Sequence, residues 1–219
     1  MLERYRTDYT GEHVLVKTVF KDGKKIQERE WIPNAVTNSH ISNRAAVIGS
    51  DVDRTLFDYS VLERHQGGLL GTKRLQTYGS GDVINHLKLN FYVNTDRERV
   101  DSLKSYAATN IVYSNTAICL KNPGLFYLIP YAPGLDDLSH AVYLAAFDKH
   151  EEVFLIGYNN DTPSINSNWI NNLDRVIKTY KNTTFYVVAA KSNIPSNWIK
   201  NSNVKILTHR DFISQCDVF

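Results

Sequence analysis

The sequence Ala45-Ala46-Val47-Ile48-Gly49-Ser50-Asp51-Val52-Asp53-Arg54 decides the fold. Its short apolar run ends at Gly49-Ser50, two acidic residues follow, and an amphipathic segment continues from Thr55 to about His65. This pattern predicts a buried strand that turns sharply into a helix. In a parallel α/β sheet, backbone N–H groups at the start of such a helix form a place where ligands collect.

Three later strand patterns end in the same polar, turn-forming way. They run into Tyr78-Gly79-Ser80-Gly81-Asp82, Val93-Asn94-Thr95-Asp96 and Gly157-Tyr158-Asn159-Asn160-Asp161. The carboxyl ends of parallel strands lie at one edge of a sheet, so these segments should lie near one another. The sequence therefore predicts one shared ligand site at that edge.

From residue 45 onward, strand patterns alternate with helix patterns. Strands are expected at 45–48, 74–78, 90–94, 111–114, 125–129, 152–157, 184–189 and 204–208. Helices are expected at 55–65, 82–88, 96–107, 136–149, 166–180 and 195–201, with a short one from Asp211. This alternation predicts one Rossmann-like, doubly wound and mostly parallel sheet in an α/β domain.

Residues 12–32 have the pattern of a β-hairpin. A β-branched, apolar strand leads to Asp22-Gly23, a favoured two-residue turn, and a strand with alternating charges returns. We expect residues 1–44 to form this appendage and a polar linker, and residues 45–219 to form the α/β domain. The hairpin is expected to be an edge addition, a lid or an arm that binds a protein partner.

Composition excludes several classes of protein. The 219 residues are 42% hydrophobic, with a formal net charge of +2 and no block of Lys and Arg, so nucleic acid is not indicated. No apolar run approaches the roughly 20 residues of a membrane span, so no membrane partner is expected. Residues 1–6 lack the apolar core of a signal peptide, which predicts a cytoplasmic location. Frequent Asn, Ile, Lys and Tyr are typical of AT-rich genomes, including many bacteriophages.

The first turn offers two interpretations. Gly49 and Ser50 could approach a nucleotide, with the following N–H groups binding phosphate. Asp51 and Asp53 would repel a phosphate unless a divalent metal ion bridged them, and either could instead cap the helix. The turn could therefore bind a phosphate-bearing ligand, with or without a divalent cation, or act only as a helix cap.

Other candidate site residues follow the later strands. Gly79, Ser80 and Gly81 could form a nest of N–H groups for an anion, or a tight turn. His140, beside Ser139 at the start of helix 136–149, could serve as a general acid or base, or be a partly exposed polar residue. Asp96 and Asp161 complete the set of candidate catalytic groups.

The order of motifs resembles a known family. A strand with a small-residue turn, the helix Phe57-Asp58-Tyr59-Ser60-Val61-Leu62, and a late Ala-rich helix leading to Glu152-Val153-Phe154-Leu155-Ile156-Gly157-Tyr158 recur in it. They resemble the Rossmann-like bacterial sialyltransferases that use CMP-linked sugars and the related motility-accessory-factor-type domains. The resemblance covers about residues 45–210. It implies a nucleotide-sugar donor over the first turn, with Ser139-His140 matching a Ser-Gly pair that touches the nucleotide.

The chain also departs from that family. Of the family's first turn, Gly-Asn-Gly-Pro-Ser, only Gly49 is kept, and the lid that carries a catalytic histidine has no counterpart, since no histidine lies between His150 and His209. The function predicted is a nucleotide or nucleotide-sugar binding domain of glycosyltransferase type, intact or degenerate. The alternative is a non-catalytic phage accessory or virion-associated protein that binds a protein partner.

Overall fold

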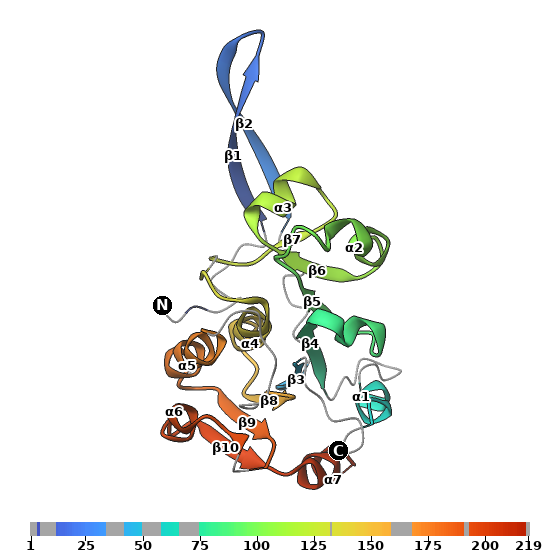
Figure 1. Cartoon of the computed structure of the whole chain (residues 1–219), viewed down its shortest axis with the longest axis vertical. Helices are drawn as coiled ribbons and strands as arrows, with labels where there is room; N and C mark the ends of the chain where they lie inside the picture. The colour runs from blue at the N-terminus through green and yellow to red at the C-terminus, as the bar shows by residue number, and fades with distance from the viewer. Residues whose placement is uncertain are drawn as a thin grey trace.

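In the computed structural model, an eight-stranded sheet forms the body of the molecule and a two-stranded hairpin projects from it (Figure 1). The structure describes residue 4 and residues 12–33, 42–49, 58–65, 75–131, 133–158, 168–190 and 193–217. Within these residues, no helix has both the length and the apolar character needed to cross a lipid bilayer.

The large sheet is parallel throughout its described pairings. Its strands are β3 (Arg44–Ile48), β4 (Gln76–Ser80), β5 (Phe91–Val93), β6 (Ile111–Ser114), β7 (Tyr127–Leu128), β8 (Glu152–Ile156), β9 (Thr184–Val188) and β10 (Val204–Leu207). They lie in the order β10-β9-β8-β3-β4-β5-β6-β7. The α/β, doubly wound fold predicted from the sequence is confirmed.

Helices cover both faces of this sheet (Figure 1). On one face lie α1 (Ser60–His65), the 3-10 helix η3 (Gly81–Asn85), α2 (Val100–Ala107), α3 (Thr116–Lys121) and α7 (His209–Asp217). On the other lie α4 (Asp137–Phe147), α5 (Trp169–Thr179) and α6 (Ser196–Ile199). The chain builds outward from β3 to β7, then α4 returns it to β8 on the other side of β3. The strand order therefore reverses between β3 and β8.

Helix α4 is buried along nearly its whole length. Every residue from Leu138 to Phe147 is buried, because Ala, Val and Leu side chains occupy most of its positions and the sheet, α5 and neighbouring segments surround it. Its first turn is fixed by Asp136, whose side chain accepts a hydrogen bond from the backbone N–H of Ser139 at 3.0 Å. Ser139 is thus the third residue of the helix.

Several segments differ from the sequence-based expectation. The helix expected at 82–88 is the 3-10 helix η3, and α2 begins at Val100 rather than at 96. Helix α3 was not expected; it begins where the Asn115 side chain accepts a hydrogen bond from the N–H of Ile118 at 3.1 Å. Strand β4 runs through Gly79 and Ser80, two residues beyond the expected end at 78. A Cβ at Gly79 would lie 2.9 Å from the Leu89 side chain and 3.1 Å from the Ile48 carbonyl oxygen, so this glycine is needed for close packing rather than for a turn.

The N-terminal hairpin forms as expected. Strands β1 (Glu12–Lys21) and β2 (Lys24–Pro33) pair antiparallel through all ten residues of each. Asp22 and Gly23 have φ angles of 52° and 74°, the two positive values that a type I′ turn requires. The hairpin extends beyond the β7 end of the sheet, and β2 contacts β7 at its base (Figure 1).

Candidate functional site

Two glycines meet where the strand order reverses. The N–H of Gly49, directly after β3, donates to the carbonyl of Ile156 in β8 at 2.8 Å. A Cβ at Gly49 would lie 2.5 Å from the Gly157 carbonyl oxygen, and Gly157 has a φ of 75°. Ligands of open α/β sheets bind outside the carboxyl ends of the strands at this type of reversal, so the Gly49–Gly157 contact marks the centre of the candidate site.

Replacing Gly49 with alanine should destabilise the fold. The new methyl group would meet backbone, which cannot rotate away, so β3 and β8 would have to separate at a cost of about 2 kcal/mol in the free energy of unfolding. Gly81→Ala is the control: its φ is 71° but nothing lies within 4 Å of its Cβ position, so only the backbone strain of about 1 kcal/mol applies. Urea denaturation measures both. Equal losses would show that the crowding at Gly49 has no energetic weight.

The start of α4 lies at the same edge of the sheet as Gly49. Thr95, just after β5, donates from its N–H to the Asp137 carboxylate at 3.0 Å and from its hydroxyl at 2.5 Å. Tyr158, just after β8, donates its hydroxyl proton to the Leu138 carbonyl at 3.0 Å. The Tyr158 ring also lies 3.1 Å from the Cβ position of Gly49. Tyr158 therefore connects the first turn to the start of α4.

Ser139 is used internally rather than presented to a ligand. It is fully buried, and its hydroxyl lies 2.8 Å from the Asp136 carboxylate and 3.3 Å from the Trp169 carbonyl. Asp136 in turn accepts a hydrogen bond from the Asn172 side chain of α5 at 2.9 Å. The N–H and hydroxyl groups of Ser139 thus both contact the Asp136 carboxylate, so Ser139 stabilises the start of α4.

His140 is a buried, neutral group. Its side chain is 5% exposed, and its Nδ1 has no hydrogen-bond partner among the residues that the structure describes. Burial lowers the pKa of His140 to about 4, although the negative charge of Asp136 acts in the opposite direction. The expectation that a first-turn histidine is partly exposed is wrong here, because α4 is covered on all sides. Near neutral pH the imidazole can exchange hydrogen bonds but carries no charge.

The carboxylates of Asp96, Asp136 and Asp137 give this edge of the sheet a negative charge. Asp96 is exposed and accepts a hydrogen bond from the N–H of Glu98 at 2.9 Å. Asp137 is half-buried; burial raises its pKa, the hydrogen bonds from Thr95 oppose that rise, and the charges of Asp136 and Asp96 add to it. Among the described residues, no group of three or more His, Cys, Asp or Glu side chains is arranged to hold a metal ion.

The end of β4 completes the described part of the edge. Ser80 is 1% exposed with extended backbone, and Gly81 opens η3 with a φ of 71°. The Gly81 carbonyl accepts a hydrogen bond from the Tyr92 hydroxyl at 2.7 Å, and Arg99 forms a 3.0 Å ion pair with Asp82 beside it. Burial raises the pKa of Tyr92 to about 12, so this hydroxyl remains a donor. Gly79 lies one residue further back, inside the strand.

Four of the candidate residues lie outside the described residues. They are Ser50, Asp51, Asp53 and Asp161. The structure brings together Gly49, Ser80, Gly81, Asp96, Ser139 and His140 at one edge, through the strand ends and the start of α4. Thr95 and Tyr158 lie in the strand-end segments quoted above but were not chosen as site residues. Asn115, whose side-chain amide donates to the Thr95 carbonyl at 3.0 Å, was not chosen either. Their one signal is position, since each directly follows a strand or comes two residues after it.

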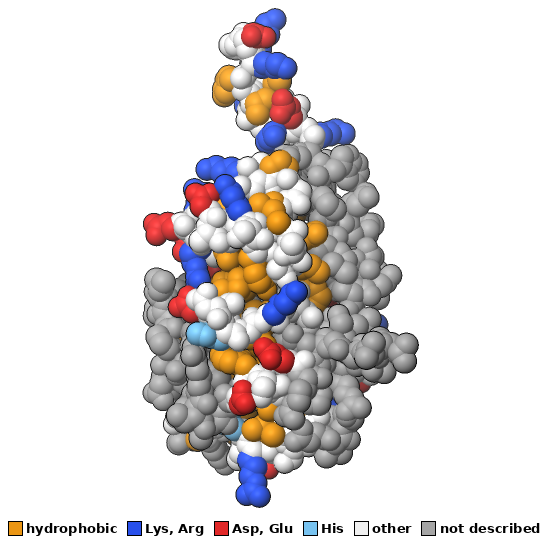
Figure 2. All heavy atoms as spheres, turned by 90° about the vertical axis from the view of Figure 1, so that its right-hand side faces the viewer, with side chains coloured by type: hydrophobic (Ala, Val, Ile, Leu, Met, Phe, Trp, Pro, Cys, Tyr) orange, Lys and Arg blue, Asp and Glu red, His pale blue; other side chains and the backbone are white. Residues whose placement is uncertain are grey.

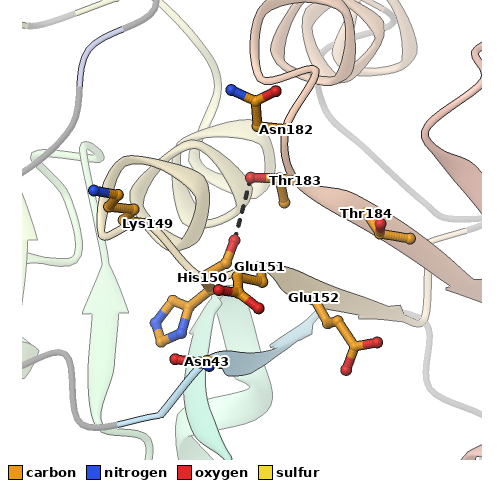
Figure 3. A pocket seen from close by; sticks show the side chains of 8 residues that line it. All are labelled: Asn43, Lys149, His150, Glu151, Glu152, Asn182, Thr183 and Thr184. Atoms are coloured by element: carbon orange, nitrogen blue, oxygen red, sulfur yellow. Dashed lines mark hydrogen bonds between the residues drawn. The ribbon is translucent and has the colours of Figure 1, made fainter.

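A surface hollow of about 730 Å³ lies at the opposite edge of the sheet (Figure 3). It is lined by Asn43, Lys149, His150, Glu151, Glu152, Asn182, Thr183 and Thr184. These residues lie at the amino ends of β3, β8 and β9, where parallel sheets do not usually bind ligands. The Thr183 hydroxyl donates to the His150 carbonyl at 3.2 Å, and Arg44 pairs with Glu152 at 2.6 Å. Thr183, the His150 carbonyl and Glu152 are thus engaged in contacts within the protein.

Comparisons with known proteins find remote similarity. No family model and no curated protein sequence matches the chain. The sialyltransferase CstII from Campylobacter jejuni, in complex with a substrate analogue, cytidine-5′-monophosphate, is 12% identical; the match covers 75% of this chain and 88% of that chain, with a TM-score of 0.40. An α-2,3-sialyltransferase from Campylobacter jejuni in apo form is 10% identical, with coverage of 85% and 99% and a TM-score of 0.47.

Both neighbours are bacterial sialyltransferases, the group that the order of sequence motifs resembles. At these identities and TM-scores, neither assigns a role to any residue of this chain. The function has to be argued from the residues at the Gly49 edge.

Proposed function

We propose that this chain is a glycosyltransferase-type domain that binds a nucleotide or nucleotide sugar at the carboxyl edge of its parallel sheet. The observation that carries the proposal is the contact between Gly49 and Gly157 at the reversal of strand order. Because neither residue has a side chain, the ends of β3 and β8 pack closely at the reversal of strand order, which is the place where open α/β sheets bind ligands. The motif order, with its resemblance to enzymes that use CMP-linked sugars, supports a nucleotide sugar as the donor.

The start of α4 would contact an uncharged part of the donor. Asp136 and Asp137 already occupy the N-terminal end of the helix, and Asp96 adds a third carboxylate, so a phosphate there would be repelled. Sugar hydroxyl groups can donate hydrogen bonds to carboxylates, and a neutral His140 fits the same chemistry. The phosphate would then lie toward the first turn.

Transfer would need a base for the hydroxyl group of the acceptor. Of Asp82, Asp96, Asp136 and Asp137 at this edge, Asp82 and Asp96 are exposed, and Asp82 is already paired with Arg99. Asp96 is therefore the candidate to receive that proton as the oxygen attacks the sugar and the nucleotide leaves. Holding donor and acceptor in line would supply much of the remaining rate.

A thermal-shift screen tests the binding step. The full chain is heated with CMP, other nucleotides and nucleotide sugars, with and without Mg²⁺ or Mn²⁺. A ligand at about 100 times its Kd should add about 2.7 kcal/mol to the free energy of unfolding and raise Tm accordingly. If no nucleotide shifts Tm at millimolar concentration, the proposed function is wrong.

A matched pair of variants tests the role of Asp96. With a donor identified by the screen, Asp96→Asn should lower the transfer rate at least about tenfold and leave Kd for the donor within a factor of a few. Asp101→Asn is the control, because Asp101 is also exposed but pairs with Lys104 on the outer side of α2. Equal rates for the two variants would remove Asp96 from the mechanism, and binding without transfer by the unaltered chain would mark a degenerate site.

A further inference from the structure

The outer half of the hairpin exposes large apolar side chains. Phe20 is 75% exposed and Val16 is 54% exposed, and among the described residues only Tyr131 and Ile199 also expose large hydrophobic side chains. Figure 2 shows hydrophobic side chains beside Lys and Arg side chains along the projecting hairpin. A two-stranded ribbon of this kind gains little stability by itself, so exposed Phe and Val on it need a reason.

These apolar side chains share one face of the ribbon with basic ones. Phe20 lies directly opposite Lys25, and Val16 lies directly opposite Arg29. Residues directly opposite in an antiparallel pair point to the same face. Thr18 and Gln27 form the pair between them, so this face carries no carboxylate from residue 16 to residue 29.

The tip concentrates positive charge. Lys21 lies directly opposite Lys24, a like-charge pair that weakens a free hairpin. Residues 16–29 hold five Lys and Arg against two carboxylates, and Glu28 already pairs with Lys17 at 3.7 Å on the other face. An anionic partner would relieve the repulsion between Lys21 and Lys24.

We propose that the hairpin tip docks on an anionic phospholipid surface. Phe20 enters the interfacial region, and Lys21, Lys24 and Lys25 contact headgroup phosphates around it. The projecting ribbon meets a plane end-on, and a bilayer places an apolar layer directly beneath a layer of anions. A nucleic acid offers the phosphates without that apolar layer. Such surface contact is distinct from a membrane span, and it does not depend on the proposed nucleotide site.

Vesicle co-sedimentation of the full chain tests this docking. The chain should bind vesicles of phosphatidylcholine mixed with phosphatidylserine, bind those of phosphatidylcholine alone far more weakly, and be released by salt. Lys21→Gln with Lys24→Gln should weaken binding about 25-fold, at about fivefold per lysine. Phe20→Ser should weaken it at least about tenfold. Lys181→Gln with Lys200→Gln, on the far side of the molecule, should change nothing.

A second experiment covers the case in which the tip variants lose vesicle binding because the hairpin no longer forms. The chain already has three tryptophans, so emission is compared with that of the unaltered chain. Phe20→Trp should show a larger shift to shorter wavelength when phosphatidylserine vesicles are added, because the new indole leaves water. Equal binding to both kinds of vesicle, or no effect of the tip variants, would overturn the proposal. It would equally fail if the tip variants lost binding to duplex DNA and kept binding to vesicles. Nucleotide-induced Tm shifts should be the same in all these variants, so the two proposals fail independently.

Discussion

Replacing Tyr78 with phenylalanine should lower the free energy of unfolding by about 3 kcal/mol. The Tyr78 hydroxyl lies 2.6 Å from the Asp148 carboxylate and 2.9 Å from Nε2 of His150, and all three side chains are at most 1% exposed. Hydrogen bonds to charged groups contribute about 1.5 kcal/mol or more each, and the variant removes both. Because the phenylalanine ring still fills the space, the loss would report the hydroxyl alone.

The positions of the protons in the cluster of Tyr78, Asp148 and His150 show how the Tyr78 hydroxyl can bond to both neighbours. Nδ1 of His150 lies 2.7 Å from the Ser42 carbonyl, which can only accept, so Nδ1 carries a proton. Tyr78 has one hydroxyl proton for two short contacts. A second proton must therefore come from Nε2 of a charged His150 or from a protonated Asp148. In either arrangement the Tyr78 hydroxyl takes part in both hydrogen bonds, so its removal leaves two buried polar groups without this partner.

Tyr186→Phe is the matched control. Its half-buried side chain lies on β9, and its hydroxyl donates to Glu152 at 3.2 Å and accepts a long, exposed hydrogen bond from Lys205 at 3.4 Å. Its removal should cost less than about 1 kcal/mol. Urea denaturation of both variants at neutral pH gives the comparison. Equal effects would mean that the buried cluster contributes no more than an ordinary surface hydrogen bond.

The sheet could be predicted because its signal is local. Strands β3 and β8 are short apolar runs that end in glycine, and the helices between them repeat apolar residues at helical spacing. These patterns need no partner to be recognised. Helix α3 was not predicted because it has only six residues. In the sequence its cap, Asn115, cannot be told from an ordinary turn residue, since only the structure shows its hydrogen bond from the N–H of Ile118.

The site could be predicted only in outline. That several strand ends share an edge follows from parallel topology, and Gly49, Asp96 and His140 do lie there. The contacts that hold the edge together join residues 42 positions apart, Thr95 with Asp137, and 20 positions apart, Leu138 with Tyr158. Such pairs leave no periodic signal. The burial of His140 was missed for the same reason, since it depends on what covers α4.

That burial should make the fold sensitive to acid. The pKa of His140 is about 4 in the folded protein and near 6.5 when the chain unfolds, because burial disfavours the charged ring. Between these values the unfolded state binds a proton that the folded state does not. The free energy of unfolding from this group is therefore fully present above pH 6.5 and falls as the pH drops, by about 3 kcal/mol at pH 4.

His140→Gln should remove this dependence, since an amide stays neutral throughout. The raised pKa of Asp137 acts in the opposite direction in acid and is common to both proteins, so the difference between their urea midpoints isolates the histidine. His86→Gln is the control, because the His86 ring is exposed. Relative to His140→Gln, the unaltered chain should lose about 3 kcal/mol from pH 7 to pH 4, and His86→Gln should follow the unaltered chain. If the free energy of unfolding changed with pH in the same way in all three proteins, water would have to reach His140 in the folded state. Its Nδ1 would then not be an unpaired group available to a ligand hydroxyl.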